Sequence, residues 1–388
     1  GEDGDGGGAG QEAQGDALIS QYIQPHANSD AILAWSVQNE PPEHGFASHL
    51  QARDRIAKAD PNHPMAVMMH DPDAFPLYAP FFPPSGMTYF RSKAAWQLGD
   101  LIRTHYSLSR GRQFWIQVPA FVYGTETPEW NTCPEMRLML NQAFANGARG
   151  WFSFAYHNTP IWMGGPCQRT LTGPFLTFSD LWSELGQRIE RFAAMLPLLG
   201  GAVPDGSHAA DFDITSKPNP RTQLPPGIPP ISWGWLQGEE YALLYIVNND
   251  IGEVTPVNIV VPENLSRGLE VYDLTDFVRS RSWAPMDRQR HIEMFPGQGQ
   301  LFLVAVREAC DYWRDIIARG IADSDIRYIE IDLELAQYYN LDTTEAMRLI
   351  RQAESGEPIE SLLAMRMARD ALTDLIYQAP RLYAPRGG

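Results

Sequence analysis

Short apolar stretches alternate with amphipathic stretches between residues 17 and 203, and this alternation constrains the fold more than any other feature. The apolar runs at 32–38, 64–69, 113–118 and 149–155 are strand candidates, and segments typical of helices separate them. Strands joined through helices form parallel sheets, because a parallel connection must cross back over the sheet. The sequence therefore predicts an α/β fold with a parallel sheet for this segment.

Three other segments differ from this pattern in composition and period. Residues 1–16 contain glycine and acidic residues without a large apolar side chain, which indicates a flexible tail or linker. Residues 208–306 hold short β-rich runs separated by turn residues, a pattern typical of an antiparallel β-sandwich. Residues 307–388 hold amphipathic stretches, the first expected to end at Gly320, and predict a small C-terminal helical region.

Composition excludes several classes of function. The chain has 30 Lys and Arg against 47 Asp and Glu, a formal net charge of −17 that repels phosphate backbones and argues against a nucleic-acid partner. It lacks an apolar run of about 18 residues, so membrane insertion is not expected. Its three cysteines do not suit a disulfide scaffold or a zinc ribbon. The histidines are too scattered for a ligand set, so neither a metal nor another cofactor is expected.

The stretch with the most chemical content is Asn39, Glu40 and Pro41, which directly follows an apolar strand. Barrels of eight βα units place their catalytic groups at the carboxyl ends of the strands. A carboxylate held there can act as a general acid, and the neighbouring amide can bind a substrate hydroxyl. On the residues alone, the alternatives are that Glu40 caps the next helix or lies in a loop without a catalytic role.

The run from His26 to Pro41 resembles the fourth strand of retaining glycoside hydrolases, in the large (β/α)-barrel clan that includes cellulases, β-galactosidases and agarases. The runs 60–64, 112–117 and 147–157 are similar to that clan's approach to strand five, lead-in to strand seven and strand eight. The resemblance covers residues 22–203. It implies that 17–203 form strands four to eight of a partial TIM-type barrel, with a sandwich after it.

The same resemblance implies a site and a ligand. Glu40 corresponds to the clan's acid/base, and the substrate class is carbohydrate, which favours an extracellular or periplasmic location. Polar and aromatic side chains near the strand ends are the candidates for binding sugar, and packing in the core or rim is the alternative for each aromatic. The candidates are Asn39, Gln117, Trp130, Tyr156, His157 and Trp162, with Trp35 as a further one.

The sequence departs from the clan at the nucleophile. Retaining hydrolysis needs two carboxylates about 5–5.5 Å apart. The clan's nucleophile is a Glu at the end of strand seven, where this chain has Gln117 followed by valine and proline. Glu43, Glu126 and Glu129 are the other candidates for the second carboxylate, whereas Glu135 is expected to open the following helix.

The second departure is length. Three preceding strands would need roughly 100 residues before Ala31, and 30 are present, so the chain is expected to hold the second half of a barrel. Unpaired barrel edges would then favour self-association. Three hypotheses remain open. One is a glycoside hydrolase that cleaves O-glycosidic bonds in a poly- or oligosaccharide, with weak or no activity. The alternative is a non-catalytic carbohydrate-binding or structural protein derived from such an enzyme. The third is a structural assembly module in which the acidic helical region 307–388 binds a partner.

Overall fold

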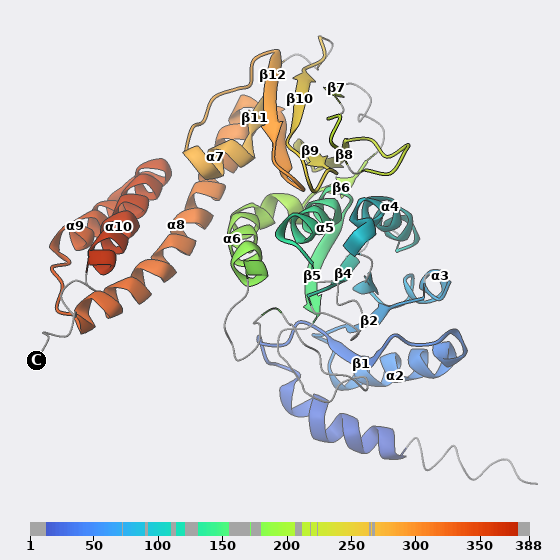
Figure 1. Ribbon diagram of the computed structural model, residues 1–388. Helices are drawn as coiled ribbons and strands as arrows, with labels where there is room; N and C mark the ends of the chain where they lie inside the picture. The colour runs from blue at the N-terminus through green and yellow to red at the C-terminus, as the bar shows by residue number, and fades with distance from the viewer. Residues whose placement is uncertain are drawn as a thin grey trace, which may run out of the picture. The chain divides into compact units, whose positions relative to one another are not determined.

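The chain divides into two compact units, Gly1–Leu181 and Trp182–Gly388. Figure 1 traces both, from blue at the N-terminus to red at the C-terminus. No described helix is both long and apolar enough to cross a membrane. The computed structural model describes residues 13–71, 73–89, 92–109, 114–120, 131–154, 171, 180–205, 212–217, 219–222, 224–263, 265 and 268–378.

The first unit contains a five-stranded parallel sheet that curls as a half-barrel (Figure 1). Its strand order, β1–β2–β3–β4–β5, follows the chain, as successive βα units require. All four neighbouring pairs are parallel, which confirms the predicted parallel sheet. The strands are β1 (Trp35–Asn39), β2 (Met65–Met69), β3 (Ser85–Thr88), β4 (Phe114–Pro119) and β5 (Ala148–Phe154).

Within the described residues, β1 and β5 are the two edges of this sheet, because each pairs with one neighbour. Strand β3 is the one that hydrophobic periodicity did not find, since its sequence is Ser-Gly-Met-Thr. Its Gly86 is required by close packing. A Cβ there would lie 2.2 Å from the sulfur of Met68 on β2 and 3.0 Å from the carbonyl oxygen of Trp115 on β4. Self-association through the outer strands β1 and β5 stays a prediction.

Helices cover one face of the sheet. Val67, Met69 and Ile116 on this outer face are fully buried. Phe114 of β4 also points outward, with its ring 5.5 Å from that of Phe75 and 6.4 Å from that of His105. The helical elements of this unit are η1 (Ile19–Ile23), η2 (Gln24–His26), η3 (Glu43–Gly45), α2 (Phe46–Ala59), α3 (Phe75–Tyr78), η4 (Ser92–Gln97), α4 (Leu98–Leu108) and α5 (Cys133–Ala145).

The N-terminal helix begins earlier than the expected boundary at residue 17. Residues 13–18 are helical, so the last part of the expected 1–16 tail belongs to the folded unit. Asp16 accepts a hydrogen bond of 3.0 Å from Arg55 Nε on α2, and this ion pair fixes the helix to its neighbour. The segment has no large apolar side chain before residue 18, which is why composition alone predicted a tail.

The second unit contains two antiparallel sheets, ordered β12–β10–β7 and β11–β13–β9–β8–β6. One apolar core takes buried side chains from both, among them Val257 of β10 and Leu244 of β9. The expected β-rich runs are confirmed as antiparallel strands β8 to β13, and β6 and β7 are additional strands. The strands of this unit are β6 (Val203–Pro204), β7 (Asp213–Ser216), β8 (Ile231–Gln237), β9 (Tyr241–Asn248), β10 (Thr255–Val260), β11 (Leu269–Asp273), β12 (Gln289–Met294) and β13 (Gly299–Val306).

The helices described in the second unit are α6 (Asp180–Gly200), which begins at the end of the first unit, α7 (Leu274–Ser280), α8 (Arg307–Tyr338), α9 (Thr344–Ser355) and α10 (Pro358–Gln378). The expected C-terminal helical region is confirmed, but its first helix does not stop at Gly320. Helix α8 continues through Gly320 because it crosses α6 there, where a Cβ would lie 3.2 Å from the Cα of Ala194. The glycine permits this close approach and does not end the helix.

Candidate active site

Glu40 lies one residue beyond the carboxyl end of β1, and its side chain is exposed. Its backbone is left-handed, with a φ of 53°, and its N–H still donates to the carbonyl oxygen of Met68 on β2 at 2.8 Å. A left-handed conformation costs a residue with a Cβ about 1–2 kcal/mol. Such a conformation persists only where surrounding contacts impose it, and it turns Glu40 out of the line of the strand.

Hydrogen bonds from neighbouring helices hold the segment that follows Glu40. Pro41 is buried, and the carbonyl oxygen of Pro42 accepts a 2.8 Å hydrogen bond from the Tyr78 hydroxyl. His49 Nδ1 lies 3.0 Å from the same hydroxyl and must supply the proton there, because the phenol has already donated its own. Burial raises the pKa of Tyr78, so the phenol stays neutral. Two neighbouring elements, α2 and α3, therefore hold the turn that presents Glu40.

The inner face of the sheet combines polar and aromatic side chains. Asn39 pairs in register with Met68, and Thr88 Oγ1 donates to Gln117 Oε1 at 3.3 Å across β3 and β4. Trp115 and Phe152 lie with ring centroids 5.3 Å apart, and Phe152 remains 41% exposed. Amides, a hydroxyl and an exposed ring on one concave face are the groups that bind the hydroxyls and apolar faces of sugars.

The structure accounts for some sequence-predicted residues and not for others. Asn39 and Gln117 lie on the same face of the sheet, on β1 and β4, near its carboxyl ends. Asn131 is buried, and its side-chain amide donates to the carbonyl oxygen of Pro119 where β4 ends. The remaining candidates lie outside the described residues: Trp130, Tyr156, His157, Trp162, Glu126 and Glu129.

Trp35 is not at the expected end of the sheet. It is the first residue of β1, so it lies at the amino end of the strand, whereas Glu40 follows the carboxyl end. Its indole N–H donates at 2.7 Å to Asp60, which is fully buried and also bonded to His63 at 2.7 Å. Burial alone would raise the pKa of Asp60, but hydrogen bonds from Trp35, His63 and two backbone N–H groups lower it below its usual value. Trp35 is therefore part of a structural network and not a sugar platform.

Glu135 opens α5, as predicted. Its carboxylate accepts from the Thr132 N–H at 2.8 Å, and its own N–H donates to Thr132 Oγ1 at 3.3 Å, which together form a capping box. Among the described cysteines, Cys310 is a buried free thiol, whereas the Cys133 thiol donates to Asp180 Oδ2 at 3.6 Å. No group of three or more His, Cys, Asp or Glu side chains arranged to hold a metal occurs within the described part of the chain.

Asp71 is a further carboxylate at this end of the sheet that was not among the sequence-predicted candidates. This exposed carboxylate lies two residues beyond the carboxyl end of β2, the strand to which Glu40 is hydrogen-bonded. Its Oδ1 accepts from the Asp73 N–H at 2.9 Å, which shapes the turn after β2. The available signal was a buried apolar run followed at once by His70 and Asp71, the same pattern that marked Glu40.

No protein-family model and no curated protein sequence matches this chain. Several solved structures are similar in fold. A family 30 endoxylanase from Clostridium papyrosolvens has a TM-score of 0.41 and 13% identity, over 76% of this chain and 70% of that one. An α-amylase from Anoxybacillus has a TM-score of 0.42 and 10% identity, over 69% of this chain and 57% of that one.

A family 42 β-galactosidase from G. stearothermophilus has a TM-score of 0.41 and 9% identity, over 76% of this chain and 75% of that one. All three proteins are glycoside hydrolases. With identities of 13% or less and TM-scores of at most 0.42, these similarities assign neither a family nor an activity to this chain.

Proposed function

We propose that this chain is a glycoside hydrolase-like protein, and that its carbohydrate site lies at the carboxyl end of the five-stranded sheet with Glu40 as the acid/base. The observation that supports this most is the left-handed backbone of Glu40, a strained position for a residue other than glycine. Strain of this kind is concentrated at functional sites, where surrounding contacts maintain it. Here those contacts come from Met68 on one side and Tyr78 on the other.

In this proposal Glu40 protonates the glycosidic oxygen as the bond to the anomeric carbon breaks, and the second carboxylate forms an ester bond to that carbon. In the second step water attacks the anomeric carbon, the second carboxylate leaves, and the Glu40 carboxylate accepts the proton of the water. Asn39 binds the hydroxyl next to the anomeric carbon, and Gln117 binds a further sugar hydroxyl. Asp71 joins Glu43, Glu126 and Glu129 as a candidate for the second carboxylate. We also infer that the two antiparallel sheets form a β-sandwich, because they share one apolar core.

A second candidate function is non-catalytic carbohydrate binding. It is favoured by Gln117, which occupies the place where the resemblance puts a nucleophile and is hydrogen-bonded to Thr88 at 3.3 Å. An amide cannot form the glycosyl-enzyme intermediate, so the covalent route through this position is closed. In this case the inner face still binds sugar, and Glu40 only accepts hydrogen bonds from it.

A panel of aryl glycosides tests the catalytic proposal. We expect slow turnover by the full chain that Glu40→Gln abolishes, because an amide can neither donate nor accept the proton. Asp71→Asn and Glu43→Gln identify the second carboxylate by a comparable loss. Asp54→Asn is the control, since that carboxylate is exposed on α2 and paired with Arg53 at 2.6 Å. Robust turnover that is the same in Glu40→Gln would contradict the assignment. Sugar binding without turnover would favour the second candidate.

A further inference from the structure

A cavity of about 350 Å³ lies in the second unit among α6, α7, α8 and α10. Four arginines line it: Arg279, Arg281, Arg366 and Arg369. Glu190 and Asp370 are the acidic side chains in the lining. This concentration of guanidinium groups stands out in a chain whose net charge is −17. Among the lining side chains, the arginines outnumber the carboxylates by two, and guanidinium groups that keep a free N–H donor can bind an anion.

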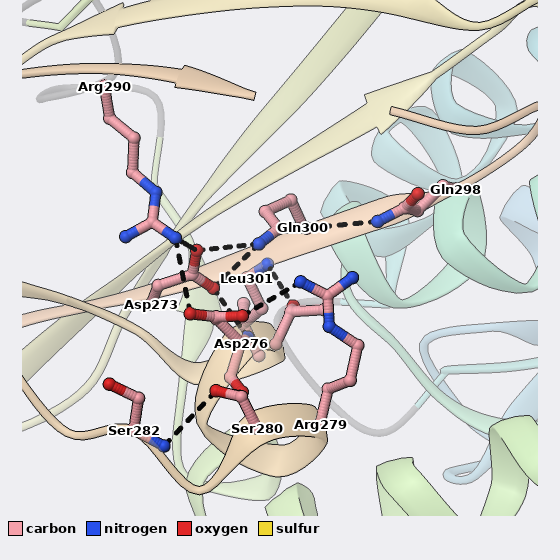
Figure 2. Close-up of polar contacts among 10 residues, drawn as sticks. Asp273, Asp276, Arg279, Ser280, Ser282, Arg290, Gln298, Gln300 and Leu301 are labelled. Atoms are coloured by element: carbon pink, nitrogen blue, oxygen red, sulfur yellow. Dashed lines mark hydrogen bonds and ion pairs between the residues drawn. The ribbon is translucent and has the colours of Figure 1, made fainter. Parts of the chain in front are cut away.

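Three of the four arginines have carboxylate partners. Arg279 pairs with Asp276 at 2.9 Å, and Figure 2 shows that Asp276 also faces Arg290. Arg366 pairs with Asp370 at 3.4 Å. Arg369 donates to Asp325 at 2.7 Å and to Glu190 at 3.1 Å. The charges of these three are therefore largely matched within the fold.

Arg281 is different. It follows α7 in a left-handed backbone conformation, with a φ of 63°, and its N–H donates to the carbonyl oxygen of Phe277 at 2.8 Å. One terminal nitrogen of its guanidinium donates to the carbonyl oxygen of Val278. Its Nε is buried and has no hydrogen-bond partner within the described chain. Arg281 is also one of the residues that line the cavity, and an acceptor from solution that reached Nε would satisfy this donor.

The electrostatic surroundings agree with this geometry. Burial lowers the pKa of Arg281 and opposes its charged form. Arg366 and Arg369 add to that effect, whereas Asp325 and Glu190 oppose it. An anion in the cavity would compensate the partly buried charge of Arg281 and the repulsion from its two arginine neighbours.

We propose that this cavity is a binding site for a small oxyanion, with Arg281 as its main donor and Arg366 as the second. A guanidinium presents its N–H groups in a planar fork that matches two oxygens of a phosphate or carboxylate group. The competing interpretation is that Arg281 is satisfied by a carboxylate of the same chain and that no anion binds. Asp325 Oδ2 is also buried and has no hydrogen-bond partner among the described residues, so a rotation could pair it with Arg281 and leave only water in the cavity.

Calorimetric titration of the full chain with inorganic phosphate, at constant ionic strength set by sodium chloride, separates the two interpretations. We expect saturable binding of one phosphate per chain. Arg281→Gln should weaken it at least ten-fold, and Arg366→Gln should weaken it measurably. Arg348→Gln is the matched control, because that arginine lies on α9 and pairs with Glu345 at 2.7 Å away from the cavity lining. Its affinity should equal that of the unmodified chain.

Parallel titrations with glycerol phosphate and with acetate identify the source of the oxyanion. Tighter binding of glycerol phosphate indicates a phosphate monoester, and tighter binding of acetate indicates a carboxylate. Arg366 is partly exposed, so Arg366→Gln provides a test even if Arg281→Gln fails to fold. The proposal is overturned if none of the three anions binds saturably, or if the control weakens binding as much as the two cavity variants.

Discussion

Acidification from pH 6.5 to pH 4 is expected to destabilise the first unit by about 3 kcal/mol through one histidine. His105 on α4 is 4% exposed, its ring lies 4.1 Å from that of Phe75, and its Nδ1 has no partner within the described residues. Burial lowers its pKa from 6.5 to about 4. The folded chain therefore keeps His105 neutral over a range in which the unfolded chain already binds the proton.

The sign follows from that difference in proton binding. Above pH 6.5 His105 is neutral in both the folded and the unfolded state, and its contribution to the free energy of unfolding is fully present. As the pH falls toward 4 the unfolded state gains a proton first, so the free energy of unfolding decreases by about 1.4 kcal/mol per pH unit. Below pH 4 both states are protonated, and this contribution stops changing.

Hydrogen exchange in β4 and α4, measured across this pH range, reports the stability of the region around His105. His105→Leu should flatten the pH dependence by about 3 kcal/mol because it removes the titrating group. His26→Gln is the control, since His26 is exposed on η2 and the substitution should leave the dependence unchanged. Equal pH dependence in His105→Leu and the unmodified chain would show that another group causes the acid sensitivity.

Gly150→Ala is expected to destabilise the first unit by about 1–3 kcal/mol, because one added carbon has no room. A Cβ on Gly150 of β5 would lie 2.3 Å from Cδ1 of Trp115 on β4. The indole is buried and lies against Phe152, so it must leave its position on the inner face. The substitution therefore disturbs the same surface on which we propose that sugar binds.

Gly186→Ala is the matched control for this substitution. It adds the same carbon to a helical glycine of α6 that has nothing within 4 Å, and should stabilise the second unit by about 0.5–1 kcal/mol. Urea unfolding followed by tryptophan fluorescence measures both variants. Opposite signs are the expected outcome. A Gly150→Ala chain as stable as the unmodified one would mean that Trp115 does not pack over this glycine.

Much of the fold could be predicted because burial on both faces makes parallel strands read as apolar runs. Strands β2 and β4 are such runs, and the antiparallel strands of the second unit lie between clear turn residues. Strand β3 could not be found this way. Its Gly86 is fixed by Met68 and Trp115, which are distant in sequence. The predicted helix end at Gly320 was wrong for a related reason. Glycine is favoured both at helix ends and at helix crossings, and only the contact with Ala194 distinguishes the two.

The candidate site was predictable in part. The position of Glu40 after an apolar strand placed it at the carboxyl edge of the sheet. The left-handed backbone of Glu40 was not predictable, because it depends on Tyr78 and Met68 from other elements. Trp35 was misplaced because an aromatic side chain next to a strand gives no indication of which end of the strand it occupies. Only the pairing of β1 with β2 places it beside Asp60.

Affinity labelling with N-bromoacetyl glycosylamines tests the central claim most directly, because it requires bound sugar and a nearby carboxylate but no turnover. A sugar bound at the carboxyl end of the sheet would bring the bromomethylene carbon to Glu40. A carboxylate oxygen of Glu40 then forms an ester bond to that carbon, and bromide leaves. Peptide mapping by mass spectrometry should find one label per chain on Glu40, absent in Glu40→Gln and retained in Asp54→Asn. A label that persists unchanged in Glu40→Gln, or no labelling across the sugar panel, would contradict a carbohydrate site built around Glu40.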